Sequence, residues 1–127
     1  MRSKEEHKKG NRLYGYFFEQ DNGVKIYLAI RTERQLYTNR VGSVSKAIRQ
    51  DDAGWAIDTS TLALAKRRGV TVIGVKSKNT GRYYFATLEA YFTPTKTKLI
   101  DWTERGGSIQ RMLPLSEFKQ IHYKIHL

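Results

Sequence analysis

The chain has 127 residues, and its 23 Lys plus Arg against 12 Asp plus Glu give a formal net charge of +11 at pH 7. The absence of cysteine excludes disulfides, a thiol nucleophile and cysteine-ligated metal centres. Hydrophobic residues make up 39% of the chain, which is too much for a disordered protein. The positive charge favours polyanionic partners. We expect a cytoplasmic protein without a membrane partner, because no apolar run is long enough to span a bilayer.

The first eleven residues, MRSKEEHKKGN, are polar and show no hydrophobic period. We therefore expect residues 1–11 to form a flexible basic N-terminal arm and residues 12–127 to form a single α+β domain. The arm either only keeps the chain soluble or reaches into a groove of a nucleic acid.

Residues 12–19 and 24–31 alternate in hydrophobicity as two strands do, and Asn22-Gly23 between them is a strong hairpin signal. Residues 32–40 are expected to be extended or looped. Residues 43–50 are expected to form a short helix that begins at Ser43.

Residues 69–92 have the clearest pattern, which predicts a second hairpin. Its first arm, residues 70–75, is apolar on both faces and indicates a strand covered on both sides. Its second arm, residues 82–92, is rich in aromatic residues, and Gly81 suits the turn between the arms. Just before the hairpin, Asp58 or Ser60 can cap a helix that ends before Gly69.

The remaining residues predict a strand over 98–103, a turn at Gly106-Gly107, a short helix over 115–120 and a strand over 121–127. The predicted fold is therefore one compact α+β domain. It has a mainly antiparallel sheet of about five strands and two or three short helices.

Two stretches concentrate the positive charge. Residues 64–82 contain six Lys or Arg and no acid, and residues 31–49 contain five against one Glu. On a shared face they would form a surface that follows phosphates, with a tyrosine available to stack bases; on different faces they would only solvate the domain. We expect a nucleic-acid-binding module, for DNA or RNA. Its candidate residues are Arg31, Arg34, Arg40, Lys46, Arg49, Lys66, Arg67, Arg68, Lys76, Lys78, Arg82 and Tyr83.

Two alternatives stay open. A metal-dependent nuclease needs converging acids and a lysine, and Asp58, Glu89 and Lys76 are the available set, with Mg²⁺ or Mn²⁺ as the cofactor. Asp58 is also explained as a helix cap, and the residues before Lys76 lack the acid of the restriction-endonuclease-like pattern. The second alternative is a small protein-binding modulator. A binding module requires neither a cofactor nor catalysis.

Overall fold

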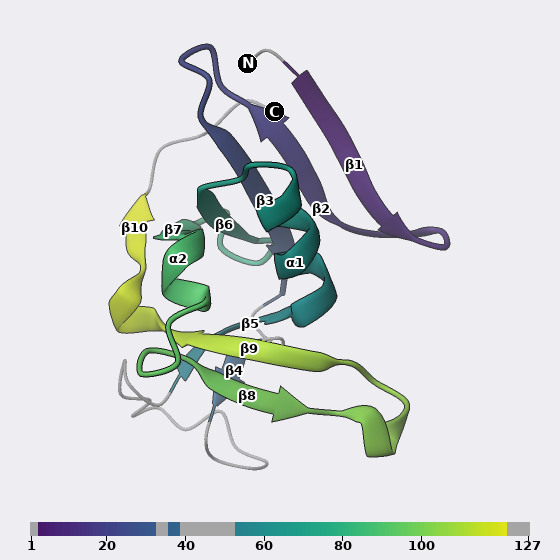
Figure 1. Ribbon diagram of the computed structural model, residues 1–127. Helices are drawn as coiled ribbons and strands as arrows, with labels where there is room; N and C mark the ends of the chain where they lie inside the picture. Colours follow the sequence, from purple (N-terminus) through teal and green to yellow (C-terminus); the bar gives the residue numbers. More distant parts are fainter. Residues whose placement is uncertain (1–2, 33–35, 39–52, 122–127) are drawn as a thin grey trace.

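A twisted sheet, sheet A, forms one half of the molecule (Figure 1). The computed structural model describes residues 3–32, 36–38 and 53–121. Within these ranges sheet A has six strands, in the order β1-β2-β3-β6-β7-β10. All neighbours are antiparallel except β3 and β6, which run parallel. The strands are β1 (Ser3–Lys9), β2 (Arg12–Glu19), β3 (Lys25–Arg31), β6 (Val72–Ser77), β7 (Tyr83–Thr87) and β10 (Lys119–Ile121).

A second sheet, sheet B, lies below sheet A in the view of Figure 1. In the described ranges it has four antiparallel strands in the order β4-β5-β9-β8. Two α-helices in the same ranges, α1 and α2, lie side by side next to the junction of the sheets (Figure 1). The bounds are β4 (Leu36–Thr38), β5 (Ala53–Asp58), α1 (Thr59–Arg67), α2 (Leu88–Tyr91), β8 (Lys98–Asp101) and β9 (Ile109–Pro114), with short 3₁₀ turns at Thr103–Arg105 and Leu115–Glu117.

The main core lies where sheet A meets sheet B and the helices. Tyr27, Trp55, Leu62 and Ile73 are almost completely buried there. The Tyr91 hydroxyl donates a hydrogen bond of 2.9 Å to the carbonyl oxygen of Trp55, which ties α2 to β5. A second apolar cluster occupies the opposite face of sheet A and includes Phe18, Ile26, Leu28 and Tyr83. The central strands of sheet A are therefore apolar on both faces.

Several sequence predictions are confirmed. The β2–β3 and β6–β7 hairpins form with antiparallel register, and β6 lies between two neighbours, as its apolar faces indicated. Helix α1 ends at Arg67. Gly69 then adopts a φ of 79°, in the left-handed region that favours glycine after a helix. The strand predicted from residue 98 is β8, and Gly106 turns the chain after it with φ 75.

Other predictions need correction. The N-terminal segment expected as a flexible arm contains β1, which pairs with β2 along its whole length. The prediction of one sheet of about five strands underestimates both the number of sheets and the number of strands. The described ranges contain ten strands, which form two sheets. The second arm of the β6–β7 hairpin ends at Thr87 and continues as α2. The helix expected over 115–120 is only a 3₁₀ turn followed by β10.

Some predictions concern residues outside the described ranges. These are the helix over 43–50, most of the segment 32–40 and most of the strand over 121–127. None of the helices in the ranges that the structure describes is long and apolar enough to cross a membrane.

Candidate anion-binding site

Four cations lie at one end of sheet A, each on a different one of four adjacent strands or its immediate extension. β2 begins at Arg12 beside the end of β3 at Arg31. The amide of Lys78, just after β6, donates to the carbonyl of Arg31 at 2.8 Å, and the carbonyl of Arg82, just before β7, accepts from Ser77 at 3.0 Å. Because adjacent strands are about 4.8 Å apart, these cations follow one another across the sheet. We call Arg12, Arg31, Lys78 and Arg82 the basic end.

Three of the four cations of the basic end line a hollow of about 400 Å³. Arg12, Arg31 and Lys78 contribute its charged lining, and none of the lining residues that the structure describes is acidic. Its remaining lining residues are Leu13, Tyr14, Ile30 and Thr32. The described lining of the hollow therefore combines cationic, apolar and aromatic residues.

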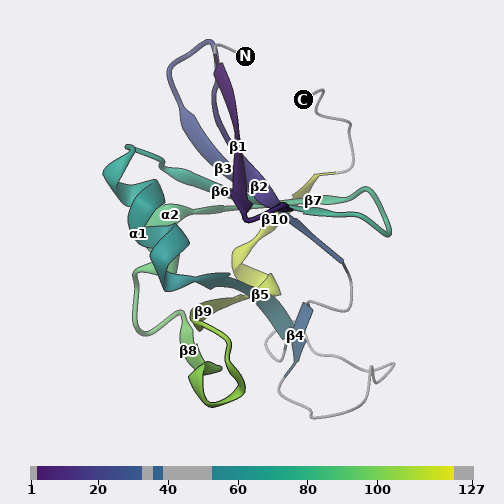
Figure 2. The same ribbon diagram turned by 90° about the vertical axis from the view of Figure 1, so that its right-hand side faces the viewer.

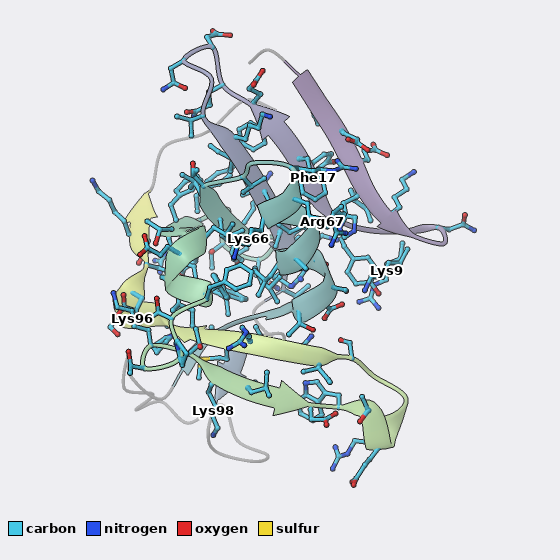
Figure 3. All side chains as sticks on the ribbon, in the orientation of Figure 1. Lys9, Phe17, Lys66, Arg67, Lys96 and Lys98 are labelled. Carbon is cyan, nitrogen blue, oxygen red and sulfur yellow. The ribbon has the colours of Figure 1, made fainter. Side chains whose placement is uncertain are left out.

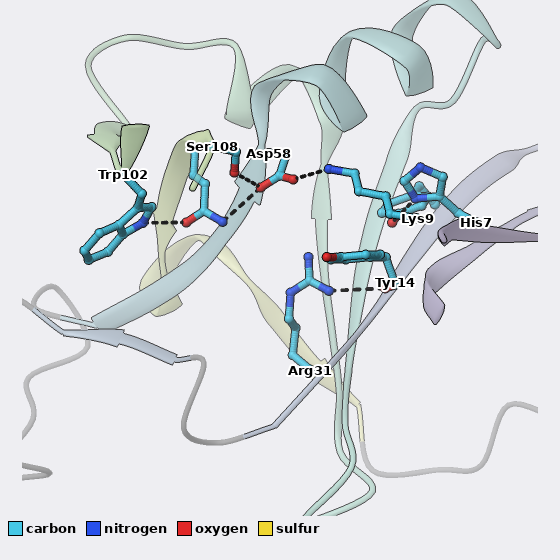
Figure 4. A network of polar contacts seen from close by, with 9 residues as sticks. His7, Lys9, Tyr14, Arg31, Asp58, Trp102 and Ser108 are labelled. Carbon is cyan, nitrogen blue, oxygen red and sulfur yellow. Dashed lines mark hydrogen bonds and ion pairs between the residues drawn. The ribbon is translucent and has the colours of Figure 1, made fainter. Parts of the chain in front are cut away.

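The guanidinium of Arg31 is held in place by the backbone. Its Nη1 donates to the carbonyl oxygen of Tyr14 at 3.2 Å (Figure 4). It also donates to the carbonyl oxygen of Ile30 at 3.0 Å. These bonds use one nitrogen of a group with five N–H donors. An anion in the hollow would meet a guanidinium whose position is already fixed, which reduces the entropy lost on binding.

The charges of the basic end are not neutralised by described carboxylates. Within residues 3–32, 36–38 and 53–121, none of the ion pairs includes one of its four cations. Arg12, Lys78 and Arg82 are also exposed to solvent. Exposed cations without a carboxylate partner attract anions, and here the four cations follow one another on adjacent strands.

The predicted basic helix end lies elsewhere. Lys66, Arg67 and Arg68 are at the carboxyl end of α1, which feeds into the start of β6. Figure 2 shows α1 at one side of sheet A and the tip of the β6–β7 hairpin at the other. Lys66 and Arg67 project from α1 (Figure 3). The two parts of the first basic stretch are thus separated by the length of β6.

Arg68 is also engaged within the protein. It forms an ion pair of 2.6 Å with Glu5, and its guanidinium lies 4.4 Å from the centre of the Phe17 ring. The ammonium of Lys66 lies over the Phe92 ring, 4.8 Å from its centre.

The other predicted binding residues divide into three groups. Lys76 lies on β6, two residues before Lys78, and its ammonium is 5.7 Å from the centre of the Tyr83 ring. Tyr83 itself is only 3% exposed, so the expectation that it stacks a base is corrected: its ring packs in the second apolar cluster. Outside the described residues lie Arg34, Arg40, Lys46 and Arg49.

The residues proposed for a nuclease do not converge. Asp58 precedes the amino end of α1, whereas Glu89 is an exposed residue of α2 beside Lys66 at the carboxyl end of α1. The prediction that Glu89 lies on a strand among aromatic residues is therefore wrong. In the described part of the chain, no three His, Asp or Glu side chains lie close enough together to hold a metal ion.

Asp58 has a different role from the predicted helix cap. It occupies the cap position of α1, but its side chain makes no capping hydrogen bond. Its carboxylate accepts from Lys9 at 2.6 Å, from Ser108 at 2.7 Å and from Gln110 at 2.9 Å (Figure 4). Burial raises the pKa of Asp58, but these hydrogen bonds outweigh burial and hold the pKa below its usual value of 3.8. The carboxylate of Asp58 is therefore engaged by three side chains of the protein itself.

Sequence reasoning missed Arg12 and Tyr14. Both precede the predicted basic stretches and belong to a hairpin that was interpreted only as structure. The Asn22-Gly23 turn did contain the signal, because the register of a hairpin brings the start of its first strand beside the end of its second. Arg12 could therefore have been placed beside Arg31.

Comparisons of the chain with known protein families, with curated proteins and with solved structures found no match. The functional argument therefore depends on the site alone.

Proposed function

We propose that this protein binds nucleic acid and that the basic end of sheet A contacts the phosphates. The observation that carries the proposal is the row of four cations on adjacent strands, free of ion pairs with the described carboxylates. Phosphate contacts supply most of the affinity in such complexes, because each neutralised phosphate releases condensed counterions. The net charge of +11 supports the same class of partner.

The test compares two pairs of substitutions that remove the same charge from opposite ends of β6. One variant carries Lys78→Gln and Arg82→Gln at the basic end. The matched control carries Lys66→Gln and Arg67→Gln on α1. All four side chains are exposed, so neither variant should disturb the fold.

The measurement is the dissociation constant for short DNA and RNA oligonucleotides across a series of salt concentrations. We expect Lys78→Gln/Arg82→Gln to weaken binding by about tenfold or more and to reduce the slope of log K against log salt by about 1.4–1.8, since each phosphate contact contributes about 0.7–0.9. The α1 control should change both quantities much less. Equal losses in the two variants would show that only total charge matters. Absence of binding by the unaltered protein at low salt would contradict the proposal itself.

A further inference from the structure

The hollow at the basic end combines two kinds of surface that a phosphate alone would not require. Arg12, Arg31 and Lys78 give it positive charge, while Leu13 and Ile30 give it apolar lining. Its volume of about 400 Å³ falls in the range of about 300–1,000 Å³ that is usual for sites that enclose small organic ligands. A simple backbone-contacting surface would be flat or convex and would need no apolar lining.

Tyr14 is the aromatic residue among the described residues that line this hollow. The Tyr14 side chain is half-buried, and the charged groups of Lys9 and Arg12 lie over its ring, 5.2 Å and 5.3 Å from the ring centre. Lys9 is held by its ion pair with Asp58, so its position beside the ring is fixed. Proteins that bind single strands combine a positively charged groove with aromatic side chains on which unpaired bases stack.

The combination excludes a regular duplex as the best ligand for the hollow. In a duplex the bases are paired and stacked inside, and the outer surface presents phosphates and sugars. Only an unpaired nucleotide offers an aromatic face and a phosphate together. The apolar lining and the Tyr14 ring would remain unused with a duplex.

We propose that the hollow lined by Arg12, Tyr14, Arg31 and Lys78 binds one unpaired nucleotide of a single-stranded nucleic acid. The base stacks on Tyr14, and the cations hold the adjoining phosphate. This inference depends on the proposed nucleic-acid binding and adds the class of ligand and the residue that recognises it.

The experiment measures affinity for two single strands of equal length and charge, oligothymidylate and an oligomer of abasic units with the same phosphates. The unaltered protein should bind oligothymidylate about tenfold more tightly, because stacking of one base on an aromatic side chain is worth roughly that factor. Tyr14→Leu should reduce this ratio to about one, whereas Tyr14→Phe, which keeps the ring, should preserve it.

The control is Tyr16→Leu. Tyr16 is on the same strand, is also half-buried and also has a cation near its ring, since the ammonium of Lys4 is 4.4 Å from its centre. It does not line the hollow, so its replacement should leave the ratio unchanged. Circular dichroism spectra and thermal unfolding of all variants verify that they are folded.

Three results would overturn the inference while leaving phosphate binding in place. The first is equal affinity of the unaltered protein for the two oligomers. The second is a ratio that survives Tyr14→Leu. The third is tighter binding of a duplex than of either of its separated strands. Failure of the proposed function is recognised differently, because then neither oligomer binds at low salt.

Discussion

His7 is half-buried although it lies on a strand at the edge of sheet A. Its Nδ1 is 2.9 Å from the hydroxyl of Tyr27, and its ring meets Phe17 and Tyr27 edge-on at 5.5 Å between ring centres. Gly15 is the register partner of His7, and a Cβ there would be only 2.8 Å from the Tyr27 hydroxyl. The missing side chain at Gly15 therefore provides the space in which the two residues meet.

Burial sets the protonation of this pair. It raises the pKa of Tyr27 to about 12, so the hydroxyl keeps its proton. The pKa of His7 lies below its usual 6.5, first because of burial and then because of the nearby charges of Lys9 and Arg68, with Arg31 acting in the same direction and Asp58 opposing it. A neutral imidazole can accept the hydrogen bond from Tyr27 through Nδ1.

The stability of the protein should therefore depend on pH through His7. The folded state resists protonation of this residue and the unfolded state does not, so the contribution is complete above pH 6.5 and declines as the pH falls from 6.5 to the lower pKa of the folded state. His7→Gln should remove this component. The measurement is the free energy of urea unfolding above and below pH 6.5 in both proteins, and an unchanged pH dependence in His7→Gln would contradict it.

Among the helices and strands, those that the sequence predicts combine a regular hydrophobic period with a residue at their end that favours a turn. The β2–β3 hairpin has alternation and Asn22-Gly23, and α1 has an apolar side and Gly69. β1 has neither. It is a strand because β2 pairs with it and because His7 packs inward, which are tertiary contacts that local sequence does not encode.

The change from strand to helix at Thr87 shows a second limit of secondary-structure prediction from the sequence. The segment after Tyr83 alternates in hydrophobicity, which favours a strand. Leu88 and Tyr91, however, are three residues apart and both buried, which suits one side of a helix. The two periods cannot be told apart over so few residues. The hydroxyl of Thr87 decides between them, because its Oγ1 accepts from the amide of Ala90 at 3.1 Å and begins α2.

Removal of this cap should destabilise the protein. We expect Thr87→Ala to lower the free energy of unfolding by about 1 kcal/mol, the usual loss when a helix loses its capping side chain. Thr87→Ser keeps a hydroxyl at the same place and should retain most of the stability. Urea unfolding of the three proteins measures the difference, and equal losses in both variants would assign the effect to packing of the threonine methyl group.

At the scale of the whole molecule, Asp58 connects the two sheets. Its carboxylate accepts hydrogen bonds from Lys9 of sheet A and from Gln110 of sheet B, and from Ser108 just before β9. Gln110 in turn accepts from the indole of Trp102 at 3.0 Å (Figure 4). The chain that joins these residues is long, so this network fixes how distant segments are placed relative to one another.

Asp58→Asn should weaken that connection. We expect a loss of about 1–3 kcal/mol in the free energy of unfolding at neutral pH, because the ammonium of Lys9 loses a charged partner. The folded state holds the pKa of Asp58 below 3.8, so the advantage of the unaltered protein is present above 3.8 and is lost as the pH falls through the folded-state pKa. The difference between the two proteins should therefore narrow in acid. A constant difference would show that charge is not its cause.

The arrangement of the sheets was the part of the fold least accessible from sequence. Alternation identifies strands, and turn residues identify hairpins, but neither specifies which strands pair across a long separation. The parallel neighbours β3 and β6 are joined through β4, β5 and α1, and β5 pairs with β9. The basic end is only partly predictable for the same reason: Arg31 and Lys78 meet through the parallel pair, which no local pattern indicates.

That parallel pair also has a kinetic consequence. β3 and β6 cannot align until the intervening chain, which contains β4, β5 and α1, has closed into a loop. Chain closure of this kind costs entropy before any contact forms, and proteins rich in such distant pairings fold slowly. The β2–β3 hairpin, whose strands are close in sequence, can form early. We therefore expect the centre of sheet A to be completed late in refolding, because the connection between β3 and β6 has to close first.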